Sequence, residues 1–361
     1  MLFKKKINQQ QVLDCLAQCI EPEVFNKLQQ QSLVSINVDT AEVILCLPFH
    51  APIWLNNLKT QAEKPLTALF KQCPVWTISY KVPVFEHKKA PKQNANIKNI
   101  IAISSGKGGV GKSTVSVNLA LALAKNGAKV GLLDADIYGP SVPTMLGEKT
   151  TKSTSADGKL LQPISAHGIV CNSIGFLIED KDAMVWRGPM ASKALQQVLN
   201  ETDWPELDYL IVDMPPGTGD IQLTMSQNVA LTSAVIVTTP QDVALIDAKK
   251  GVTMFNKVDV KVTGLIENMS LYSCVKCGHQ EAIFGTGGGK KLAEQFNLAF
   301  LGELPLHIQY RENTDQGYPT VAKNEQAELV VPYLALAESV AINLFKDLPP
   351  TIEQIKITEL K

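Results

Sequence analysis

Eight consecutive residues, from Gly106 to Ser113, match the pattern GxxxxGKS/T of a phosphate-binding loop, and Thr114 follows them. They follow the apolar run Ile100 to Ile103 and precede the helical pattern Val115 to Lys125, the strand–loop–helix context that gives this pattern its meaning. Glycines let backbone N–H groups turn toward a phosphate, and a helix start adds partial positive charge. The sequence therefore predicts a nucleotide site in which Lys112 reaches the terminal phosphates and the Ser113 hydroxyl ligates Mg2+. The predicted loop consists of Gly106, Lys107, Gly108, Gly109, Val110, Gly111, Lys112, Ser113 and Thr114.

Two acidic segments come at the ends of further apolar runs and would complete this site. Asp136 follows the run Val130 to Leu133, and Asp213 follows the run Tyr209 to Val212. Because ligands gather at the carboxyl edge of an open α/β sheet, both carboxylates are expected near the phosphates. We expect Asp136 to orient the attacking water. We expect Asp213 to hold Mg2+, directly or through water, ahead of a glycine-rich switch segment that can respond to the γ-phosphate.

Three further polar side chains fit either this site or a purely structural role. Asn268 follows the run Val262 to Ile266, and an amide can pair with both a donor and an acceptor on adenine. The alternative for Asn268 is a turn residue. Asp134 and Asp220 could face the nucleotide, or they could cap a helix or accept hydrogen bonds from nearby backbone. ATP is therefore the expected nucleotide, with Asn268 as the candidate contact to its base.

Cys274 and Cys277 form a CxxC that Gly278 and His279 follow. Two thiols separated by two residues can ligate one metal centre from a single turn. Zinc and a [4Fe-4S] cluster usually take four thiolates, so the remaining ligands must come from His279, from solution or from a second copy of the chain. Two pairs facing each other across a twofold axis would supply all four. A redox dithiol and part of a structural zinc site are the alternatives.

The composition is that of a globular protein with one large or two ordinary domains. The 361 residues are 45% hydrophobic and 19% charged. With 34 basic and 35 acidic side chains, the formal net charge of -1 offers no basic surface for duplex nucleic acid, so no nucleic acid partner is expected. No apolar run approaches the roughly 20 residues of a membrane span, and no signal-peptide core follows the start. The odd number of cysteines favours reduced thiols, so we expect a cytoplasmic protein without a membrane partner.

A break in the hydrophobic pattern divides the chain. Residues 85–97 are rich in charge and amides and contain a proline, which is typical of a tether between domains. Residues 1–84 predict a small α+β domain, and residues 98–347 the main domain, followed by a tail over 348–361. Within the small domain, the patterns predict a helix over 11–28, two strands over 33–47, a helix over 51–72 and a strand over 76–84.

Short apolar runs alternate with helix-length segments in the main domain. Continuous apolar runs are typical of strands buried on both faces, and the intervening helices would form the crossovers of a parallel sheet. The predicted fold is therefore α/β, a doubly wound and mostly parallel sheet, with the helical stretch Gln326 to Phe345 covering it. The predicted strands are Ile100 to Ile103, Val130 to Leu133, Ile169 to Ile174, Tyr209 to Val212, Ala234 to Thr238, Val262 to Ile266 and Phe300 to Leu304.

The loop form KGGVGKS/T, which begins at Lys107, resembles the deviant Walker A class of P-loop ATPases. This class includes the MinD and ParA ATPases, nitrogenase iron protein and the Mrp/ApbC iron-sulfur carriers. The resemblance implies that Lys107 reaches across a homodimer interface to the other subunit's nucleotide. There it would supply positive charge to phosphoryl transfer, as an arginine finger does elsewhere. A solvated loop lysine is the alternative.

A series of segments between about residues 97 and 345 together resembles the Mrp/ApbC family. Membership implies a slow ATPase that carries a [4Fe-4S] cluster on Cys274 and Cys277 between two subunits, receives it from upstream donors and delivers it to apoproteins. A MinD- or ParA-like positioning ATPase without a cluster and an ATPase with structural zinc are the alternatives. Besides the loop and the CxxC, the segments are Asp134 to Ser141, Trp186 to Met190, Asp213 to Asp220, Glu267 to Ser270, Ile283 to Gly289, Arg311 with Glu312, and Asp315 to Pro319.

The residues before the tether resemble the MIP18-type domain that is often fused ahead of this ATPase. Many such domains carry a cysteine in the loop after the second strand. The corresponding stretch here, Leu47 to Trp54, contains no cysteine, and the neighbouring Cys46 falls within a strand pattern. A docking or regulatory role is therefore expected for this domain in place of cluster handling.

Overall fold

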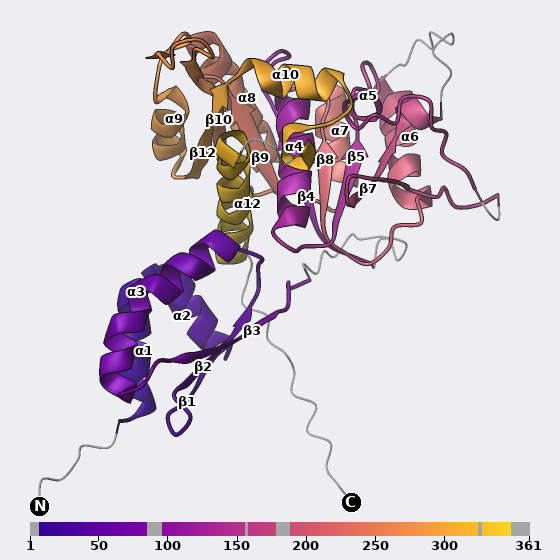
Figure 1. The fold of residues 1–361 in the computed structure, drawn as a ribbon. Helices are drawn as coiled ribbons and strands as arrows, with labels where there is room; N and C mark the ends of the chain where they lie inside the picture. Colours follow the sequence, from indigo (N-terminus) through magenta and orange to yellow (C-terminus); the bar gives the residue numbers. More distant parts are fainter. Residues whose placement is uncertain (1–6, 85–95, 156–157, 178–187, 324–326, 348–361) are drawn as a thin grey trace, which may run out of the picture. The chain divides into compact units, whose positions relative to one another are not determined.

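The computed structural model describes residues 7–84, 96–155, 158–177, 188–323 and 327–347 (Figure 1). It divides into two compact units, one with residues up to Pro83 together with Leu344 to Asp347, the other with Val84 to Asn343. The main domain was expected to extend to residue 347, whereas the last turn of the final helix joins the first unit. There Phe345 packs against Phe49, with ring centroids 5.7 Å apart. The expected tail and residues 85–95 of the expected tether lie outside the described residues.

The first unit is a three-stranded sheet with three helices. The central strand β2 pairs antiparallel with β1 and parallel with β3. The single helix expected over 11–28 is two helices, because Pro22 can begin a helix but cannot continue one. The other elements lie where the patterns predict them. The elements are α1 Gln9–Cys19, α2 Pro22–Gln30, β1 Val34–Asn37, β2 Glu42–Leu47, α3 Pro52–Phe70 and β3 Val75–Tyr80.

The second unit is built on a 9-stranded sheet whose central strands are parallel, in the order β12-β10-β9-β4-β8-β5-β7. The seven predicted strands are all present, and the mostly parallel α/β fold is confirmed. The short strands β6 and β11 pair antiparallel at the margins and were not predicted. The strands are β4 Ile97–Ser104, β5 Val130–Asp134, β6 Ile164–Ala166, β7 Ile169–Ser173, β8 Leu207–Asp213, β9 Ser233–Thr238, β10 Val262–Ser273, β11 Gln280–Glu281 and β12 Ala299–Leu306.

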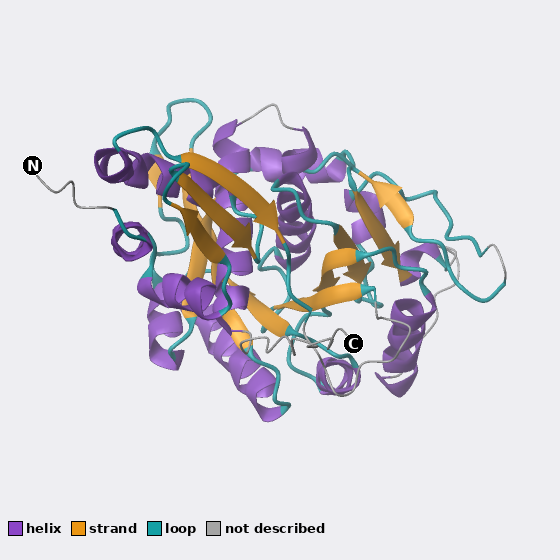
Figure 2. Ribbon diagram, turned by 90° about the horizontal axis from the view of Figure 1, so that it is seen from below, coloured by secondary structure: helices purple, strands orange, loops and turns teal. Residues whose placement is uncertain are grey.

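Helices cover both faces of this sheet (Figure 2). On one face α6 to α9 share a single apolar core with the strands, in which Phe255 and Leu210 are completely buried. The remaining helices group around α4, whose residues 115–123 are all buried. The helices are α4 Lys112–Lys125, α5 Val142–Met145, α6 Gly188–Glu201, α7 Asp220–Asn228, α8 Asp242–Lys257, α9 Gly288–Phe296, α10 Ile308–Asp315, α11 Thr320–Lys323 and α12 Ala327–Asp347, with a 3-10 turn at Ile174–Phe176.

Helix α12 corrects the expectation that no apolar run approaches the length of a membrane span. Its residues Glu328–Asp347 are long and apolar enough to cross a bilayer by length and composition alone. More than half of this stretch, 56%, is buried within the protein. Tyr333 is buried, and the Tyr310 hydroxyl donates to the Leu329 carbonyl at 2.8 Å. Such burial is typical of a core helix, and one such helix is weak support for a membrane span.

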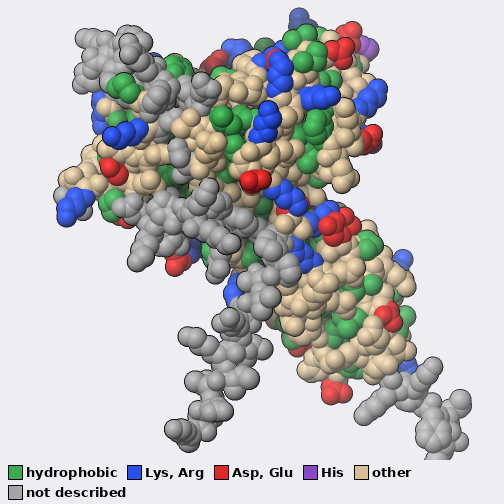
Figure 3. Space-filling view, turned by 180° about the vertical axis from the view of Figure 1, so that it is seen from behind, with side chains coloured by type: hydrophobic (Ala, Val, Ile, Leu, Met, Phe, Trp, Pro, Cys, Tyr) green, Lys and Arg blue, Asp and Glu red, His purple; other side chains and the backbone are tan. Residues whose placement is uncertain are grey.

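Charged side chains of both signs are scattered over the face shown in Figure 3. Basic and acidic groups alternate there over the described part of the chain, as the nearly equal totals of 34 and 35 lead one to expect.

Candidate functional site

The predicted site segments leave the sheet at one edge, because their strands run parallel. The phosphate loop follows β4, Asp134 ends β5 and Asp213 ends β8. The neighbouring strands remain linked beyond their ends, since the Ala135 N–H donates to the Asp213 carbonyl at 2.9 Å. The carboxyl edge therefore gathers segments that lie about a hundred residues apart in the chain.

The phosphate loop is packed on one side and open on the other. Gly109 and Gly111 have φ angles of 84° and 82°, in the left-handed region that favours glycine. A Cβ on Gly106 would lie 2.1 Å from the backbone of Asp247 in α8, so only glycine allows this approach. A Cβ on Gly109 would meet nothing within 4 Å. Lys107 in the same loop is half-buried, and no described residue pairs with its ammonium group.

The side chains expected to bind phosphate and magnesium meet in the interior. The Lys112 ammonium lies 2.7 Å from Oδ1 of Asp213 and 3.1 Å from the Ser113 hydroxyl. Ser116 also donates to Oδ1 of Asp213, at 2.6 Å. The other carboxylate oxygen of Asp213 is buried and has no hydrogen-bond partner within the described structure.

This arrangement fits the chemistry of magnesium. A buried carboxylate oxygen without a hydrogen bond, close to a serine hydroxyl, is a set of hard oxygen donors that Mg2+ prefers. Ser113 and Asp213 are therefore the residues that would hold it. When bound, the ion would neutralise charge on the terminal phosphates.

The two carboxylates after β5 have different surroundings. Asp134 is completely buried and accepts hydrogen bonds from the Asp136 N–H, the Val142 N–H and the Ser173 hydroxyl. Burial, together with the charge of Asp213, raises the pKa of Asp134 to about 7. The Asp136 and Val142 N–H groups are nearby backbone donors, so Asp134 has the structural role that was expected as an alternative, in which it accepts hydrogen bonds from nearby backbone. The side chain of Asp220 lies outside the described side chains.

Asp136 is half-buried, and charged residues of the phosphate site act on its carboxyl group. Burial raises the pKa of its carboxyl group, the nearby Lys112 ammonium lowers it, and Asp213 raises it again. A carboxylate with a raised pKa is a better proton acceptor, which suits a residue that orients an attacking water.

Asn268 is a strand residue, which excludes its alternative role as a turn residue. Strand β10 extends to Ser273, well beyond the predicted end at Ile266. The Asn268 amide donates to the Val110 carbonyl of the phosphate loop at 2.8 Å. The side chain also lines a cavity of about 190 Å³ between this loop and α10. The cavity wall beyond Asn268 includes Met269, His307, Tyr310 and Arg311.

The cysteine pair lies at the tip of the hairpin formed by β10 and β11. The Cys274 N–H donates to the His279 carbonyl at 2.9 Å, and the Gly278 N–H donates to the Cys274 carbonyl at 2.8 Å. Gly278 has a φ of 70°, which closes this tight turn. Cys277 is exposed and Cys274 is half-buried, so the turn presents its sulfurs at the surface.

The turn stabilises the thiolate form of its first cysteine. The backbone N–H groups of Lys276 and Cys277, and then the Cys277 thiol, hydrogen-bond to the Cys274 sulfur and lower its pKa. The thiolate is the form that ligates metals. Within the part of the chain that the structure describes, no third His, Cys, Asp or Glu joins the two thiols. His279 contributes its carbonyl to the turn.

Comparison with known proteins decides the family. A family model described as ParA, the NUBPL iron-transfer P-loop NTPases, matches residues 96–341. The chain belongs to this family. The iron-sulfur cluster carrier protein of Escherichia coli (strain K12) is 55% identical over 308 residues, which are 85% of this chain and 84% of the relative. The iron-sulfur cluster transfer protein NUBPL of Mus musculus is 49% identical over 258 residues, 70% of this chain and 81% of the relative.

Solved structures agree with this assignment. A nucleotide-binding protein from Archaeoglobus fulgidus in complex with ADP has a TM-score of 0.58 and 37% sequence identity, and covers 65% of this chain and 92% of its own. The MinD cell division ATPase of Pyrococcus furiosus, at 20% identity and a TM-score of 0.50, shares the fold. The resemblance to the Mrp/ApbC carriers is confirmed. The likeness of the first unit to the MIP18 type stays a prediction.

Ser116 was missed by the sequence analysis, and Glu267 appeared there only as part of a family segment. Ser116 lies one helical turn beyond Lys112, a spacing that places both on one face of α4 and could have revealed it. Glu267 is a charged residue at the end of an apolar run, and it is completely buried. Of the family segment Trp186 to Met190, residues 186 and 187 lie outside the described residues.

Proposed function

We propose that this chain is an ATP-dependent iron-sulfur cluster carrier, which binds a [4Fe-4S] cluster at a dimer interface and transfers it to apoproteins. One observation carries the proposal: a single strand, β10, holds Asn268 against the phosphate loop and ends next to Cys274. The candidate nucleotide site and the two thiols are therefore joined by one strand. The cargo is proposed from the family and from relatives named as cluster carriers.

The nucleotide site has side chains for each task of ATP hydrolysis. Lys112 would bind the terminal phosphates after leaving Oδ1 of Asp213, and Ser113 and Asp213 would hold Mg2+. Asp136 would orient a water whose oxygen attacks the γ-phosphorus and would accept its proton, while the bond to the ADP oxygen breaks and ADP and phosphate leave. Lys107, which lacks a partner among the described residues, would add positive charge at the other subunit's nucleotide. The proposed turnover is slow.

The cysteine site is half of a cluster site. One chain offers two thiolates, and a homodimer with the two hairpins facing across its axis would offer four. The exposure of Cys277 suits a cargo that must enter from a donor and leave to an acceptor. All seven cysteines are free thiols, which supports our placing of this chemistry in the reducing cytoplasm.

The nucleotide site and the cysteine pair would be coupled. ATP would draw the subunits together, and hydrolysis would loosen the glycine-rich segment after Asp213 and change the geometry of the cysteine pair. Such coupling requires the nucleotide to bind the two states of the dimer with different affinity, since equal affinity shifts no equilibrium.

Anaerobic reconstitution with iron and sulfide tests the proposal. We expect visible iron-sulfur absorption, four irons per two chains, and transfer to a cluster-free acceptor at a rate that depends on ATP. Lys112→Ala should abolish ATP binding but permit reconstitution. Cys274→Ala should abolish cluster binding but keep ATP binding, and Cys73→Ala, which removes an exposed thiol of the first unit, should do neither.

Three outcomes would contradict the proposal. A full cluster on Cys274→Ala would show that the site is assigned to the wrong residues. Zinc retained in place of iron would indicate a structural zinc site. ATP-dependent dimers without any metal at the thiols would indicate a MinD-like binding switch.

A further inference from the structure

Glu267 is a buried carboxylate whose partners are backbone N–H groups. It is 0% exposed, and its two oxygens accept hydrogen bonds from Gly287 at 3.3 Å and from Gly289 at 2.6 Å. These donors belong to the start of α9, where the N-cap residue Gly287 has no side chain that could cap the helix. A buried carboxylate is costly unless it is hydrogen-bonded, and a helix N-terminus stabilises negative charge. Glu267 therefore holds the start of α9 to strand β10.

The held segment is the glycine-rich loop that follows the cysteine hairpin, residues 283–289. A Cβ on Gly288 would lie 2.5 Å from a methyl carbon of Leu245 and 2.8 Å from the Pro240 carbonyl. A Cβ on Gly289 would lie 3.1 Å from the Glu267 carboxylate. The loop is therefore packed between β10 and the start of α8. Glycine is required for the approach at Gly288, and at Gly289 a side chain would crowd the Glu267 carboxylate. Neither the nucleotide site nor the cysteine pair described above accounts for this packing.

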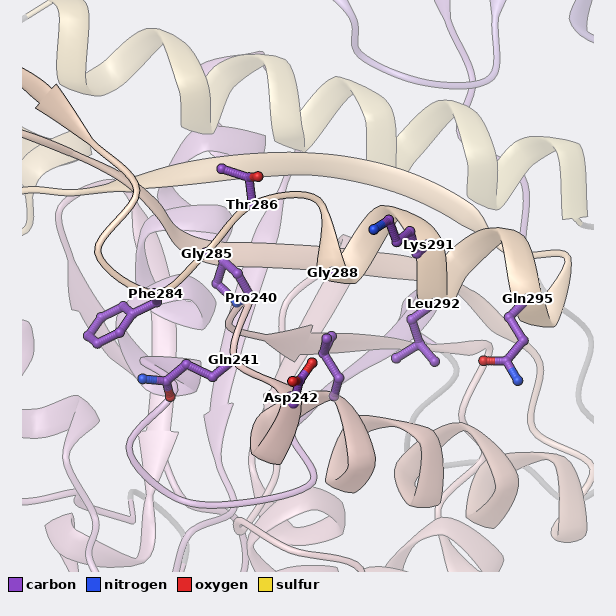
Figure 4. A pocket seen from close by; sticks show the side chains of 11 residues that line it. Pro240, Gln241, Asp242, Phe284, Gly285, Thr286, Gly288, Lys291, Leu292 and Gln295 are labelled. Atoms are coloured by element: carbon purple, nitrogen blue, oxygen red, sulfur yellow. The ribbon is translucent and has the colours of Figure 1, made fainter.

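The loop is also one wall of a cavity of about 440 Å³ (Figure 4). In Figure 4, Gly285 and Gly288 lie on the loop, and Gln241 and Asp242 lie at the start of α8 on the other side. Helix α8 itself touches the phosphate loop, through the backbone of Asp247 at Gly106. The glycine-rich loop thus lies between an element that contacts the phosphate loop and the hairpin that carries the thiols.

Strand β10 connects the same two regions through neighbouring side chains. Successive residues of a strand point to opposite faces, so Asn268 reaches the phosphate loop and Glu267 reaches the glycine-rich loop. Beyond Asn268 the pairing with β12 shifts register, and Met269 has a φ of 58°, which a non-glycine residue rarely adopts. Six residues after Asn268 the strand reaches Cys274. Asn268 and Glu267 are thus neighbours on one strand, which leads to the cysteine hairpin.

We propose that Glu267 is a positioning residue that couples the nucleotide site to the cysteine pair. A base that competes with Val110 for the Asn268 amide would shift β10. Glu267 would then move the glycine-rich loop together with the strand, so that both ends of the 274–289 segment change together. Without the carboxylate, the far end of this segment moves independently of the nucleotide. The inference rests on the proposed function, because the coupling would serve cluster transfer. Its test does not require a bound cluster.

Hydrogen exchange measured by mass spectrometry on the full chain tests this proposal, with and without a non-hydrolysable ATP analogue and Mg2+. In the wild type, we expect the analogue to change protection both in the phosphate loop and at 274–289. Glu267→Gln replaces one acceptor oxygen with a donor, so the amides of 287–289 should exchange roughly 10- to 100-fold faster. The nucleotide effect at 274–289 should disappear, while protection of the phosphate loop persists.

Two further variants complete the design. Glu303→Gln, on the neighbouring strand β12 and paired in register with Glu267, removes an exposed carboxylate and should behave like the wild type. Glu267→Asp keeps the charge on a shorter side chain and should lose part of the coupling. If Glu267→Gln does not fold, the Asp variant decides the question by the same comparison.

Several results would overturn the inference. One is a nucleotide effect at 274–289 that persists in Glu267→Gln although its loop amides exchange faster, because Glu267 would then only stabilise the loop. Others are unchanged exchange at 287–289, and a wild type without any nucleotide effect at 274–289. If the wild type fails to bind a cluster, the proposed function is contradicted instead. The exchange result would then still decide whether Glu267 couples the two regions.

Discussion

The Lys112 ammonium lies 2.7 Å from Oδ1 of Asp213, and the two side chains are 6% and 0% exposed. The lysine of the phosphate loop therefore rests on the carboxylate proposed for Mg2+. Nucleotide binding would exchange this ion pair for one between Lys112 and phosphate, and would release Asp213 for the metal. The ion pair thus stabilises the nucleotide-free arrangement, and nucleotide binding would have to break it.

Removing one partner of this buried pair should be far more harmful than removing both. Asp213→Ala leaves Lys112 buried and unpaired, and should lower the free energy of unfolding by roughly 3–5 kcal/mol in urea titrations without nucleotide. Adding Lys112→Met should recover most of this loss. As a control, Glu206→Ala breaks the exposed pair with Lys129 and should cost less than about 1 kcal/mol. Equal losses for Asp213→Ala and Glu206→Ala would contradict the prediction.

Two glycines of the phosphate loop should differ in their tolerance of alanine. Both Gly109 and Gly111 have positive φ, so each substitution should cost about 1–2 kcal/mol in backbone strain. At Gly111 the new Cβ would also lie 2.3 Å from the Asn268 amide nitrogen and would displace it from Val110. We expect Gly111→Ala to unfold at a lower urea concentration than Gly109→Ala, because its free energy of unfolding should fall by about 1 kcal/mol more. We also expect Gly111→Ala to bind nucleotide less tightly. Equal losses in the free energy of unfolding and in nucleotide affinity would show that the Asn268 side chain can move away from the new Cβ without a cost.

Lys107 should act on the nucleotide of the partner subunit. Lys107→Ala should keep ATP affinity but lower turnover at least roughly tenfold, since finger cations contribute on the order of 10³-fold or more elsewhere. Mixing it with the inactive Lys112→Ala variant should restore activity. In the mixed dimer, one subunit has an intact Lys112 and its partner supplies Lys107. Absence of restoration after subunit exchange would show that Lys107 works within its own chain or not at all.

Cys274 should react with iodoacetamide at lower pH than an ordinary thiol. The N–H groups of Lys276 and Cys277 stabilise its thiolate and lower its pKa, so more thiolate is present at a given pH and the rate profile shifts to lower pH. Peptide mapping by mass spectrometry, with a short cysteine peptide as reference, measures this profile. Cys171 is buried, and its pKa is raised to about 12, so it should remain unmodified in the folded protein. A Cys274 profile that coincides with the peptide's would refute the prediction.

Local patterns in the chain were sufficient for much of this description. The apolar runs predicted seven strands, because burial on both faces of a parallel sheet demands consecutive apolar residues. The phosphate loop and the CxxC turn were recognised for the same reason: their residues act within a few positions of one another. Periodicity alone missed the break at Pro22. The apolar spacing of one helix continues across this residue, but the proline divides the segment into two helices.

The contacts that make the sites work were beyond such patterns. Lys112 and Asp213 are 101 residues apart, and Asn268 and Val110 are 158 apart. Their meeting depends on the order of the strands in the sheet, which no local run of residues encodes. The length of β10 was missed because its polar second half, with Glu267 and Asn268, lacks the apolar signature of a buried strand. Those side chains are buried because distant segments satisfy their hydrogen bonds, a property of the folded chain as a whole.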